Sequence, residues 1–465
     1  MPTVSAGGRV AVVLHTHMPY VEGYGTWPFG EEWLWEAIAM SYLPLLAQLD
    51  DGAPLTLSLT PVLCDQLAAP GALERCLAFL REIRPASHAL DAEWARERGE
   101  EDVALELERA AGEYAAAADT LAAIGDTLVG RMGAHAAWTS AATHAVLPLV
   151  ATDAGVRLQV ETGIASHRER FGAWRGGFWL PECAHEPWLD PLLEEAGVHA
   201  VCAELTDVLG LGDPRHLTPL RTGDGPLVVP IDRLLIDRVW AADGYPQAAE
   251  YRDSFRRTPN HHHPWANDGA VYDPDRARAR ARSDAADLVA RCRERVADGG
   301  LCVLAFDTEL FGHWWHEGPA FLAAVVDEAR RTGLTLTGLD DALTDVPTAP
   351  WPPDFDGATT WGDPHTLLTW SNPAVADLAS RQRDAELRVV AAGPSVSERA
   401  VRELLAVQAS DWPFLISRGQ AGDYPRERFD GHLRDLEAAL DAVPSSDAAV
   451  RNLAPHLTVA PLLEP

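Results

Sequence analysis

Two short segments of this chain place a carboxylate directly after an apolar stretch and follow it with histidine or tryptophan. Residues 177–185 read Gly-Phe-Trp-Leu-Pro-Glu-Cys-Ala-His and contain Glu182, and residues 305–315 read Ala-Phe-Asp-Thr-Glu-Leu-Phe-Gly-His-Trp-Trp and contain Asp307. A carboxylate at the end of a buried strand is poorly solvated, and aromatic rings beside it offer flat faces to a pyranose ring. Chemistry at a glycosidic bond requires a nucleophile and a proton donor. The two segments therefore predict a carboxylate pair that faces a sugar.

Each carboxylate also has a structural explanation, because acidic residues commonly cap the helix or turn that follows a strand. Two such segments in one chain are harder to explain by capping alone, so the pattern favours a catalytic role for both carboxylates. In that hypothesis Asp307, with a raised pKa, protonates the glycosidic oxygen, and Glu182 attacks the anomeric carbon.

His15 and His17 form a second candidate site at the end of another apolar stretch. Alternate residues of an extended strand share a face, so the two rings would point the same way. Metal-dependent amidohydrolases place two histidines at this point of a barrel, and His144, His185 and His313 are further candidate ligands. Many of them also use a bridging lysine, and this chain contains none. We expect no metal ion and no other cofactor, with His15 and His17 bonding a sugar or filling polar positions in the core.

Aromatic residues and a histidine-rich segment complete the set of candidates. The chain has 16 tryptophans, and those beside glycine or acidic residues fit sugar stacking, although any single one is more often structural.

Three consecutive histidines stand between Asn260 and Pro264. Asparagine and proline mark a loop, and three sequential histidines do not easily face one ion, so this segment is predicted to be a solvated loop.

The composition excludes some partners. The 465 residues carry a formal charge of −31, and all 38 basic residues are arginine. This balance argues against nucleic acids, other polyphosphates and anionic membranes. We find no signal-peptide pattern at the start and no run of about 20 apolar residues. The six cysteines lack a CxxC motif, which is typical of buried thiols in the reducing cytoplasm.

Apolar stretches alternate with helical patterns along the chain, which favours an α/β architecture with parallel strands. In barrels of this class, catalytic residues lie at the carboxyl ends of strands. His15, Glu182 and Asp307 all fall at such ends, so a barrel is favoured over an open sheet. No nucleotide-binding glycine motif follows a strand. The strand candidates are 9–14, 55–60, 177–180, 199–203, 227–231, 301–306 and 335–337.

Three further segments indicate domain organisation. Residues 72–128 are charged, rich in alanine and helical in pattern. Residues 345–356 are rich in proline and acidic residues and are predicted to be a linker. Residues 373–443 are strongly helical in pattern, so a C-terminal helical domain is expected.

Taken in order, six motifs resemble those of glycoside hydrolase family 57 and, within it, its branching enzymes. The resemblance implies a distorted (β/α)7 barrel with an inserted helical region and a C-terminal all-helical domain. The implied boundaries are 1–65 with 131–345 for the catalytic barrel, 66–130 for the insertion and 350–465 for the C-terminal domain. The motifs occupy residues 15–20, 141–149, 179–183, 306–315, 360–372 and 410–416, with further similarity at 29–34 and 42–46.

The resemblance also implies a retaining double displacement, with Glu182 as the nucleophile and Asp307 as the acid/base. An α-1,4 bond of a glucan is cleaved, a glycosyl-enzyme forms, and a glucan 6-hydroxyl takes the chain to make an α-1,6 branch. Retention requires the two carboxyl groups to lie roughly 5–5.5 Å apart. Tyr245 lies in a segment similar to a mobile loop that keeps water from the intermediate, or else in an ordinary turn. The implied substrate-binding residues are His15, His17, Trp27, His144, Tyr245, Trp315, Trp361 and Trp370.

One departure from the family pattern leaves alternatives open. The family usually has an acidic residue before its second motif, and residues 135–139 of this chain read His-Ala-Ala-Trp-Thr. The main hypothesis is a cytoplasmic glycogen branching enzyme that acts on amylose or a glycogen-like α-glucan, as a monomer or small homo-oligomer. The alternatives are an α-amylase or 4-α-glucanotransferase with the same carboxylate pair, a metal-dependent hydrolase, and a non-catalytic glucan-binding protein.

Overall fold

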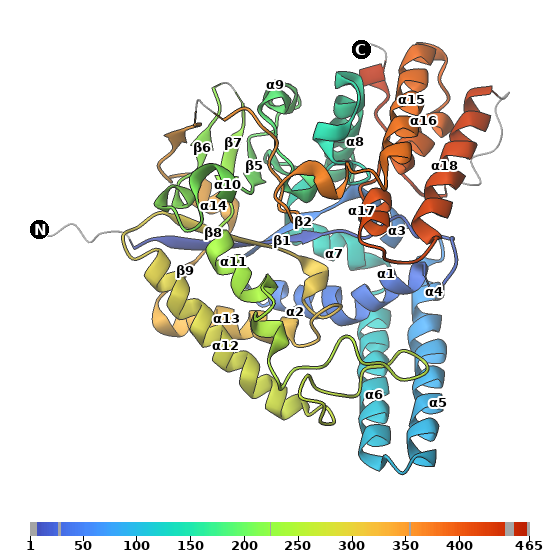
Figure 1. Ribbon diagram of the computed structural model, residues 1–465, viewed down its shortest axis with the longest axis vertical. Coiled ribbons are helices and arrows are strands. Elements are labelled where there is room, and N and C mark those ends of the chain that lie inside the picture. The colour runs from blue at the N-terminus through green and yellow to red at the C-terminus, as the bar shows by residue number, and fades with distance from the viewer. Residues whose placement is uncertain (1–6, 27–28, 224, 353–354, 442–450, 463–465) are drawn as a thin grey trace, which may run out of the picture.

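The strands of this protein join in one ten-stranded sheet within the part of the chain that the structure describes (Figure 1). The computed structural model describes residues 7–26, 29–223, 225–352, 355–441 and 451–462. The order of strands is β10-β6-β7-β5-β4-β3-β2-β1-β8, and β9 also pairs with β1. The strands are β1 Arg9–Thr16, β2 Leu55–Leu59, β3 Ala136–Ser140, β4 Gly177–Trp179, β5 Ala200–Ala203, β6 Leu220–Arg221, β7 Leu227–Pro230, β8 Leu301–Asp307, β9 Thr335–Leu336 and β10 Ala349–Pro350.

Neighbouring strands from β7 through β5, β4, β3, β2 and β1 to β8 all run in parallel. The two outer strands of this row also meet, because the N–H of Asp232, just after β7, donates to the carbonyl oxygen of Val303 in β8 at 2.8 Å. The row thus curls into the distorted (β/α)7 barrel that the sequence predicts. Its register sets His15 of β1 opposite both Ser58 of β2 and Asp307 of β8.

All seven strand candidates of the sequence coincide with strands, but three strands were not predicted. Strand β3 is central and short, and its alanines give no alternating pattern to recognise. The other two, β6 and β10, have two residues each. Because Ala349 and Pro350 pair with Leu220 and Arg221, part of the predicted linker 345–356 is an edge of the sheet.

The helices surround the barrel and form two further groups. The antiparallel pair α5 and α6 projects to one side, and α15 to α18 gather near the C-terminus (Figure 1). None of the helices in the described ranges has both the length and the apolar character needed to span a lipid bilayer. The helices are α1 Glu31–Ala37, α2 Leu43–Asp50, α3 Pro61–Leu67, α4 Ala72–Ala78, α5 Arg84–Glu97, α6 Glu101–Ile124, α7 Leu128–His135, α8 Asp153–Phe171, α9 Asp190–Glu195, α10 Thr206–Leu209, α11 Arg233–Trp240, α12 Pro274–Arg295, α13 Gly318–Thr332, α14 Leu339–Leu343, α15 Ala376–Ala392, α16 Glu398–Val407, α17 Asp411–Ser417 and α18 Tyr424–Asp441.

The C-terminal helices share a core with the barrel side of the molecule. Trp412 of α17 and Phe429 of α18 are fully buried, and they belong to one apolar cluster with Tyr20, Val62 and Leu158. Burial of side chains this large gives a continuous apolar contact between the two parts. The helices after the predicted linker are therefore packed firmly against the end of the barrel that carries Tyr20.

The histidine-rich segment lies against α5, and the prediction of a solvated loop is wrong for its central residue. His262 is buried, and its ring stacks on His88 with a centroid distance of 3.5 Å. Asp91 of α5 accepts hydrogen bonds from the Thr258 hydroxyl and from the Asn260 side chain. These buried polar partners fix the loop on the helix, a tertiary contact that the local sequence does not indicate.

Candidate active site

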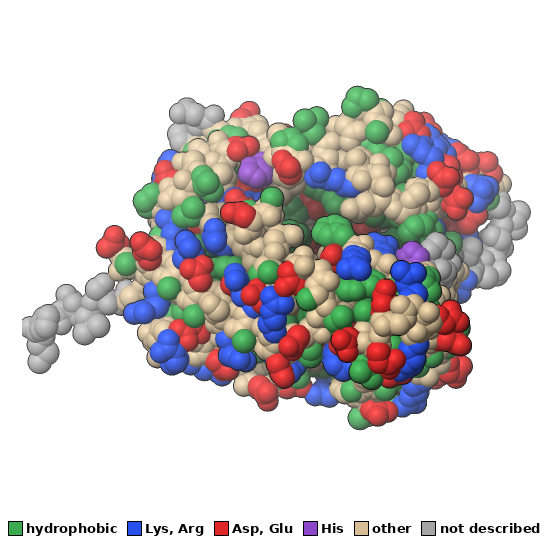
Figure 2. Space-filling view, turned by 60° about the horizontal axis from the view of Figure 1, so that its bottom comes forward, with side chains coloured by type: hydrophobic (Ala, Val, Ile, Leu, Met, Phe, Trp, Pro, Cys, Tyr) green, Lys and Arg blue, Asp and Glu red, His purple; other side chains and the backbone are tan. Residues whose placement is uncertain are grey.

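A cavity of about 1360 Å³ opens at the carboxyl ends of the parallel strands. Its lining includes His17, Glu182 and Asp307, which follow or end β1, β4 and β8. The lining continues onto the C-terminal helices on one side and onto α5, α6 and residues 252–264 on the other. The space-filling view shows a hollow near the centre of this face (Figure 2). The cavity therefore collects residues from segments that are far apart in the sequence.

Glu182 is held in a strained turn directly after β4. Its backbone is left-handed, with φ 63° and ψ 22°, and the next residue, Cys183, also has a positive φ of 48°. Such a conformation costs on the order of 1–3 kcal/mol for a residue other than glycine and persists only where surrounding contacts enforce it. One of these contacts is the backbone N–H of Trp361, which donates to the Glu182 carbonyl oxygen at 3.1 Å. The strain directs the carboxylate into the cavity.

Two donors orient the carboxylate of Glu182. The indole Nε1–H of Trp361 donates to Oε2 at 3.0 Å, and the hydroxyl of Ser410 donates to Oε1 at 3.2 Å. Ser410 immediately precedes α17, so the C-terminal helices supply part of this site. Both donors favour the ionised form of the carboxylate.

Asp307 and Glu182 both lie in poorly solvated surroundings. Burial raises the pKa of Asp307 to about 6, although the charge of His17 opposes the shift. Burial also raises the pKa of Glu182 to about 7; the Trp361 hydrogen bond opposes that shift, and the charge of Asp307 adds to it. Both carboxyl groups line the same cavity, and the charge of Asp307 acts on Glu182 there.

A chain of hydrogen bonds runs from Glu182 into the barrel. Nδ1 of His144 lies 2.8 Å from the Ser410 hydroxyl oxygen, and Nε2 of His144 lies 2.8 Å from Nε2 of His15. Burial lowers the pKa of both histidines, so both rings are neutral. Because Ser410 donates to Glu182, its oxygen accepts from Nδ1–H of His144, and His144 in turn accepts from His15. The chain ends at the Ser58 hydroxyl, 3.3 Å from Nδ1 of His15.

His17 forms an ion pair with the C-terminal helices. Its Nε2 lies 3.0 Å from Oδ1 of Asp411 in α17, and its backbone N–H donates to Oε1 of Glu309 at 3.2 Å. Burial alone would lower the pKa of His17, but the carboxylates of Asp411, Glu309 and Glu182 together raise it. His17 is therefore suited to be a cation among the carboxyl groups of the site.

Glu309 adds a third carboxyl group beside Asp307. The hydroxyl of Tyr42 donates to its Oε1 at 2.5 Å, and burial raises the pKa of Glu309 to about 8 despite this bond. The sequence analysis did not assign Glu309, Ser410 or Asp411 a role. The signal was present, because Glu309 lies in the same motif as Asp307 and the other two open the motif at 410–416.

The predicted aromatic residues divide into two groups. Trp361 and Trp370 line the cavity, whereas the lining does not include Trp315 or Tyr245. Trp315 is 3% exposed, with its ring against Tyr251. Tyr245 is buried in the turn that packs on α12, where its hydroxyl donates to Asp287 at 2.7 Å. Trp27 lies outside the described residues.

The neighbouring residue Trp314 occupies the position that was predicted for Trp315. It lines the cavity and is 62% exposed. The chain turns tightly after β8, where the N–H of Gly312 donates to the Trp315 carbonyl oxygen at 2.8 Å. This turn directs the ring of Trp315 into the core and leaves the ring of Trp314 at the rim.

Three of the histidines that were considered as metal ligands, His15, His17 and His185, have hydrogen-bond partners in the protein. Both ring nitrogens of His15 and both of His17 have protein partners within 3.3 Å. His185 is buried away from the cavity lining, with Nε2 2.8 Å from Oδ1 of Asp190. These contacts assign the three rings to the hydrogen-bonding framework of the barrel end.

Comparisons with known proteins agree with this architecture. The family description "Glycosyl hydrolase family 57" matches residues 131–349, and "1,4-alpha-glucan branching enzyme, C-terminal" matches residues 370–457. The chain is 31% identical to a probable 1,4-alpha-glucan branching enzyme of Mycobacterium tuberculosis, over 94% of this chain and 93% of the relative. It is 30% identical to a 1,4-alpha-glucan branching enzyme of Thermococcus kodakarensis, over 92% of this chain and 73% of the relative.

Solved structures show the same likeness. The GH57-type branching enzyme of Pyrococcus horikoshii superimposes with a TM-score of 0.88 at 28% identity, covering 98% of this chain and 97% of that one. An α-amylase of Thermotoga maritima, 21% identical, shares the fold with a TM-score of 0.80, covering 99% of both chains. Fold and comparisons together define a protein of the glycoside hydrolase class. The chain belongs to glycosyl hydrolase family 57, as the resemblance of its motifs implied.

Proposed function

We propose that this protein is a 1,4-α-glucan branching enzyme in which Glu182 is the nucleophile and Asp307 is the acid/base. The observation that carries the proposal is the desolvated Glu182, held by donors from Trp361 and from Ser410 of the C-terminal region, in one cavity with Asp307. The match of that C-terminal region to the branching-enzyme description supports branching over simple hydrolysis.

The proposed mechanism places the single proton of the carboxyl pair on Asp307. Glu182 accepts two hydrogen bonds, which stabilise its charge. No described residue donates a hydrogen bond to the side chain of Asp307, and only the charge of His17 favours its ionised form. A retaining mechanism needs the proton on Asp307 at its start. The two donors to Glu182 support that state, whereas burial raises the pKa of Glu182 to about 7, above the value of about 6 for Asp307.

The reaction then proceeds in two displacements. In the first, Glu182 attacks the anomeric carbon of the donor glucan, the bond to the glycosidic oxygen breaks, and Asp307 gives its proton to that oxygen. In the second, the 6-hydroxyl of an acceptor glucan loses its proton to Asp307 and attacks the anomeric carbon, and Glu182 leaves. A glycosyl ester on Glu182 is the intermediate between them.

Other residues of the site position these groups. Ser410 and His144 fix the orientation of the Glu182 carboxylate, and His17 with Asp411 supplies a positive charge near both carboxyl groups. Trp361 offers a ring on which the donor sugar stacks, whereas Trp370 is only 2% exposed and supports the cavity wall from the core.

The proposal also covers the substrate, the cellular location, the domain division and the oligomeric state. The substrate is an α-glucan polysaccharide such as amylose or a glycogen-like polymer. The six cysteines are buried free thiols, which suits the cytoplasm. We propose the same division into a barrel (1–65 and 131–345), an insertion (66–130) and a C-terminal helical domain (350–465), in a monomer or small homo-oligomer.

Hydrolysis of the glycosyl-enzyme competes with branching, and one observation indicates that some hydrolysis occurs. Tyr245, the residue expected to keep water from the intermediate, is buried against α12 and does not line the cavity. Water then competes with the acceptor hydroxyl for the same glycosyl-enzyme, as in an α-amylase.

The test is incubation of amylose with the wild-type protein and with Glu182→Gln. Enzymatic debranching followed by chain analysis counts new α-1,6 branches, and a reducing-end assay counts hydrolysis. New branches that exceed new reducing ends, both lost in Glu182→Gln, support the proposal. Reducing ends without branches would identify a hydrolase, and an unchanged glucan would leave a binding protein.

A further inference from the structure

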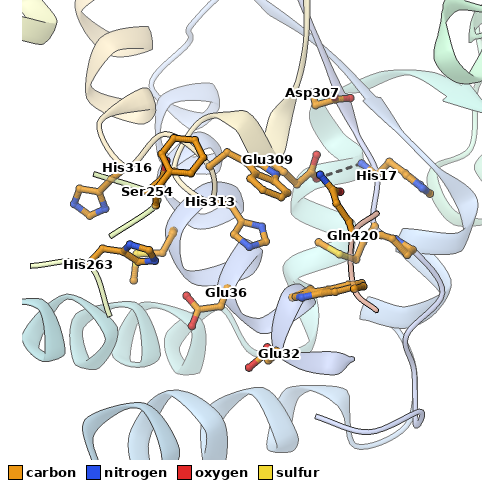
Figure 3. Close-up of a pocket in the computed structure, with 18 of the residues that line it drawn as sticks. His17, Glu32, Glu36, Ser254, His263, Asp307, Glu309, His313, His316 and Gln420 are labelled. Carbon is orange, nitrogen blue, oxygen red and sulfur yellow. Dashed lines mark hydrogen bonds between the residues drawn. The ribbon is translucent and has the colours of Figure 1, made fainter. Parts of the chain in front are cut away.

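The cavity contains a second polar region that the proposed mechanism does not use. Glu32 and Glu36 of α1, Met40 of the π-helical turn that follows, and His313 after β8 all line it. Positions 32, 36 and 40 are four residues apart and so lie on one face of the helical stretch. Figure 3 shows His313 between Glu36 and Glu309 in that view, with Glu32 at the same side of the cavity as Glu36.

The two glutamates of this region differ in their partners. Glu36 forms an ion pair with Arg84 and accepts a hydrogen bond from the Tyr114 hydroxyl at 2.6 Å. Glu32 is only 7% exposed, and no described residue forms a hydrogen bond or an ion pair with its carboxyl group. Burial raises the pKa of Glu32 to about 8; the charge of Arg84 opposes the shift, and that of Glu36 adds to it. The carboxyl oxygens of Glu32 are not among the fully buried atoms without a partner, so they face the cavity with their hydrogen bonds open to a ligand.

The side chain of His313 also leaves hydrogen bonds unmade within the protein. Its Nδ1 is buried without a hydrogen-bond partner among the described residues. Burial lowers the pKa of His313, and the nearby charges of Glu36 and Arg84 act in opposite directions. The ring is therefore neutral, with one nitrogen that donates and one that accepts. Nδ1 of His313 is fully buried, so the atom that meets a ligand is Nε2, which no described residue bonds and which is not fully buried. The Glu32 carboxyl group and Nε2 of His313 thus offer unused donors and acceptors to the cavity, the pattern that the hydroxyl groups of a neutral sugar satisfy.

This region lies on the Asp307 side of the cavity. Tyr42, at the end of the helical stretch that begins with α1, bonds to Glu309, two residues after Asp307. His313 follows Asp307 by six positions. The proposed base removes the proton of the incoming hydroxyl, so the acceptor must approach the anomeric carbon from the side of Asp307, opposite the ester bond to Glu182. The partners of Glu182, in contrast, are Trp361 and Ser410.

We propose that Glu32 and His313 form a subsite for the acceptor glucan, in which pyranose hydroxyls take the hydrogen bonds that the protein leaves unmade. The inference rests on the proposed branching function and deepens it. The acceptor held there delivers its 6-hydroxyl to the anomeric carbon of the glycosyl-enzyme. The proton passes to Asp307, the new carbon–oxygen bond forms, and the ester bond to Glu182 breaks. Trp314, exposed at the rim, continues the path of the acceptor outward.

The test measures how the glycosyl-enzyme divides between acceptor and water. Wild type, Glu32→Ala, Glu32→Gln and His313→Ala are incubated with amylose, and new α-1,6 branches are divided by new reducing ends. This ratio does not depend on how fast the intermediate forms. Glu74→Ala is the matched control, because Glu74 is exposed on α4 and does not line the cavity. We expect the ratio to fall about tenfold in Glu32→Ala and His313→Ala, as for the loss of one buried hydrogen bond. In Glu32→Gln, which keeps a donor and an acceptor, and in Glu74→Ala, we expect it to stay within about twofold.

The outcomes separate the two proposals. A wild-type protein that makes no branches contradicts the proposed function itself. A branching wild type whose ratio is unchanged in both Glu32→Ala and His313→Ala overturns the acceptor subsite alone, as does a parallel fall of branching and hydrolysis in both. Should Glu32→Ala fail to fold, as judged by circular dichroism, His313→Ala together with Glu32→Gln decides the question.

Discussion

The hydroxyl of Ser410 donates a hydrogen bond of 3.2 Å to the carboxylate of Glu182, across 228 positions of sequence. The same hydroxyl oxygen lies 2.8 Å from Nδ1 of His144. The residue before α17 therefore contacts the proposed nucleophile directly, so the C-terminal helices do more than cover the cavity. Because the contact joins the end of β4 to the residue before α17, any shift of the C-terminal helices changes the orientation of Glu182.

Replacing Ser410 by alanine tests this link. The change removes one donor from the Glu182 carboxylate and leaves Nδ1–H of His144 without its acceptor. We expect kcat on amylose to fall about tenfold, because a hydrogen bond to a charged group contributes roughly 1.5–3 kcal/mol, while KM changes little. Ser395→Ala, at an exposed serine of the same region, is the control. An unchanged kcat in Ser410→Ala would mean that Trp361 alone orients the nucleophile.

The pH dependence of kcat/KM reports on the carboxyl pair. Activity requires Glu182 ionised and Asp307 protonated, so we expect a bell-shaped profile with apparent pKa values of about 6 and about 7 that belong to the pair. Below this range both groups hold a proton and the nucleophile is lost. Above it both are ionised and the acid is lost.

Trp361→Phe should move the alkaline limb of that profile. The indole N–H of Trp361 lowers the pKa of Glu182, so its removal raises that pKa. Because Glu182 has the higher pKa of the pair, the alkaline limb moves to higher pH and the activity at the optimum falls. The profile is measured beside that of Trp188→Phe, a tryptophan that does not line the cavity. A limb that stays in place would show that Ser410 alone stabilises the charge.

Asp411→Asn should move the opposite limb. Without the Asp411 carboxylate the pKa of His17 falls, because burial is no longer offset by its ion-pair partner. A neutral His17 no longer lowers the pKa of Asp307, which is the lower pKa of the pair, so the acid limb moves to higher pH. On Glu182 the loss of the His17 charge and the loss of the Asp411 charge have opposite effects, so the alkaline limb moves less. Asp423→Asn, an exposed aspartate near α18, should leave both limbs unchanged.

The sequence predicted the parts of this site that follow a strand in the same segment. Glu182 and Asp307 were identified because each ends an apolar stretch, and parallel strands bring their carboxyl ends to one edge. Strand β3 was missed because its alanines carry no alternation, although it lies between two predicted strands in the sheet. The local sequence pattern thus predicted the barrel and its two carboxylates. Strand β3 can be recognised only from its pairing with β2 and β4 in the structure.

Contacts between distant segments could not be predicted in this way. The roles of Ser410 and Asp411 depend on how α17 packs on the barrel, and no spacing within either segment encodes that packing. Tyr245 and Trp315 were assigned to the cavity from motif position, yet their side chains point into the core. In a turn, the direction of a side chain is decided by tertiary contacts and not by its place in a motif.

The adjacent residues Trp314 and Trp315 allow that last point to be tested. Trp314 is 62% exposed and lines the cavity, whereas Trp315 is 3% exposed and packs against Phe321 with a centroid distance of 4.8 Å. We expect Trp314→Ala to raise KM for amylose severalfold, by about the 0.5–1.5 kcal/mol of a stacked ring, without changing the melting temperature. Trp315→Ala should instead destabilise the fold by about 3–5 kcal/mol through the cavity that it leaves.

Kinetics on amylose and thermal unfolding of both variants check this pair of expectations, with Trp188→Ala as a partly exposed tryptophan away from the cavity. The two effects must separate, since one ring is at the rim and the other is in the core. A lower melting temperature in Trp314→Ala, or an increased KM with unchanged stability in Trp315→Ala, would reverse the assignment. The sugar-binding ring after β8 would then be Trp315, as its motif position alone had predicted.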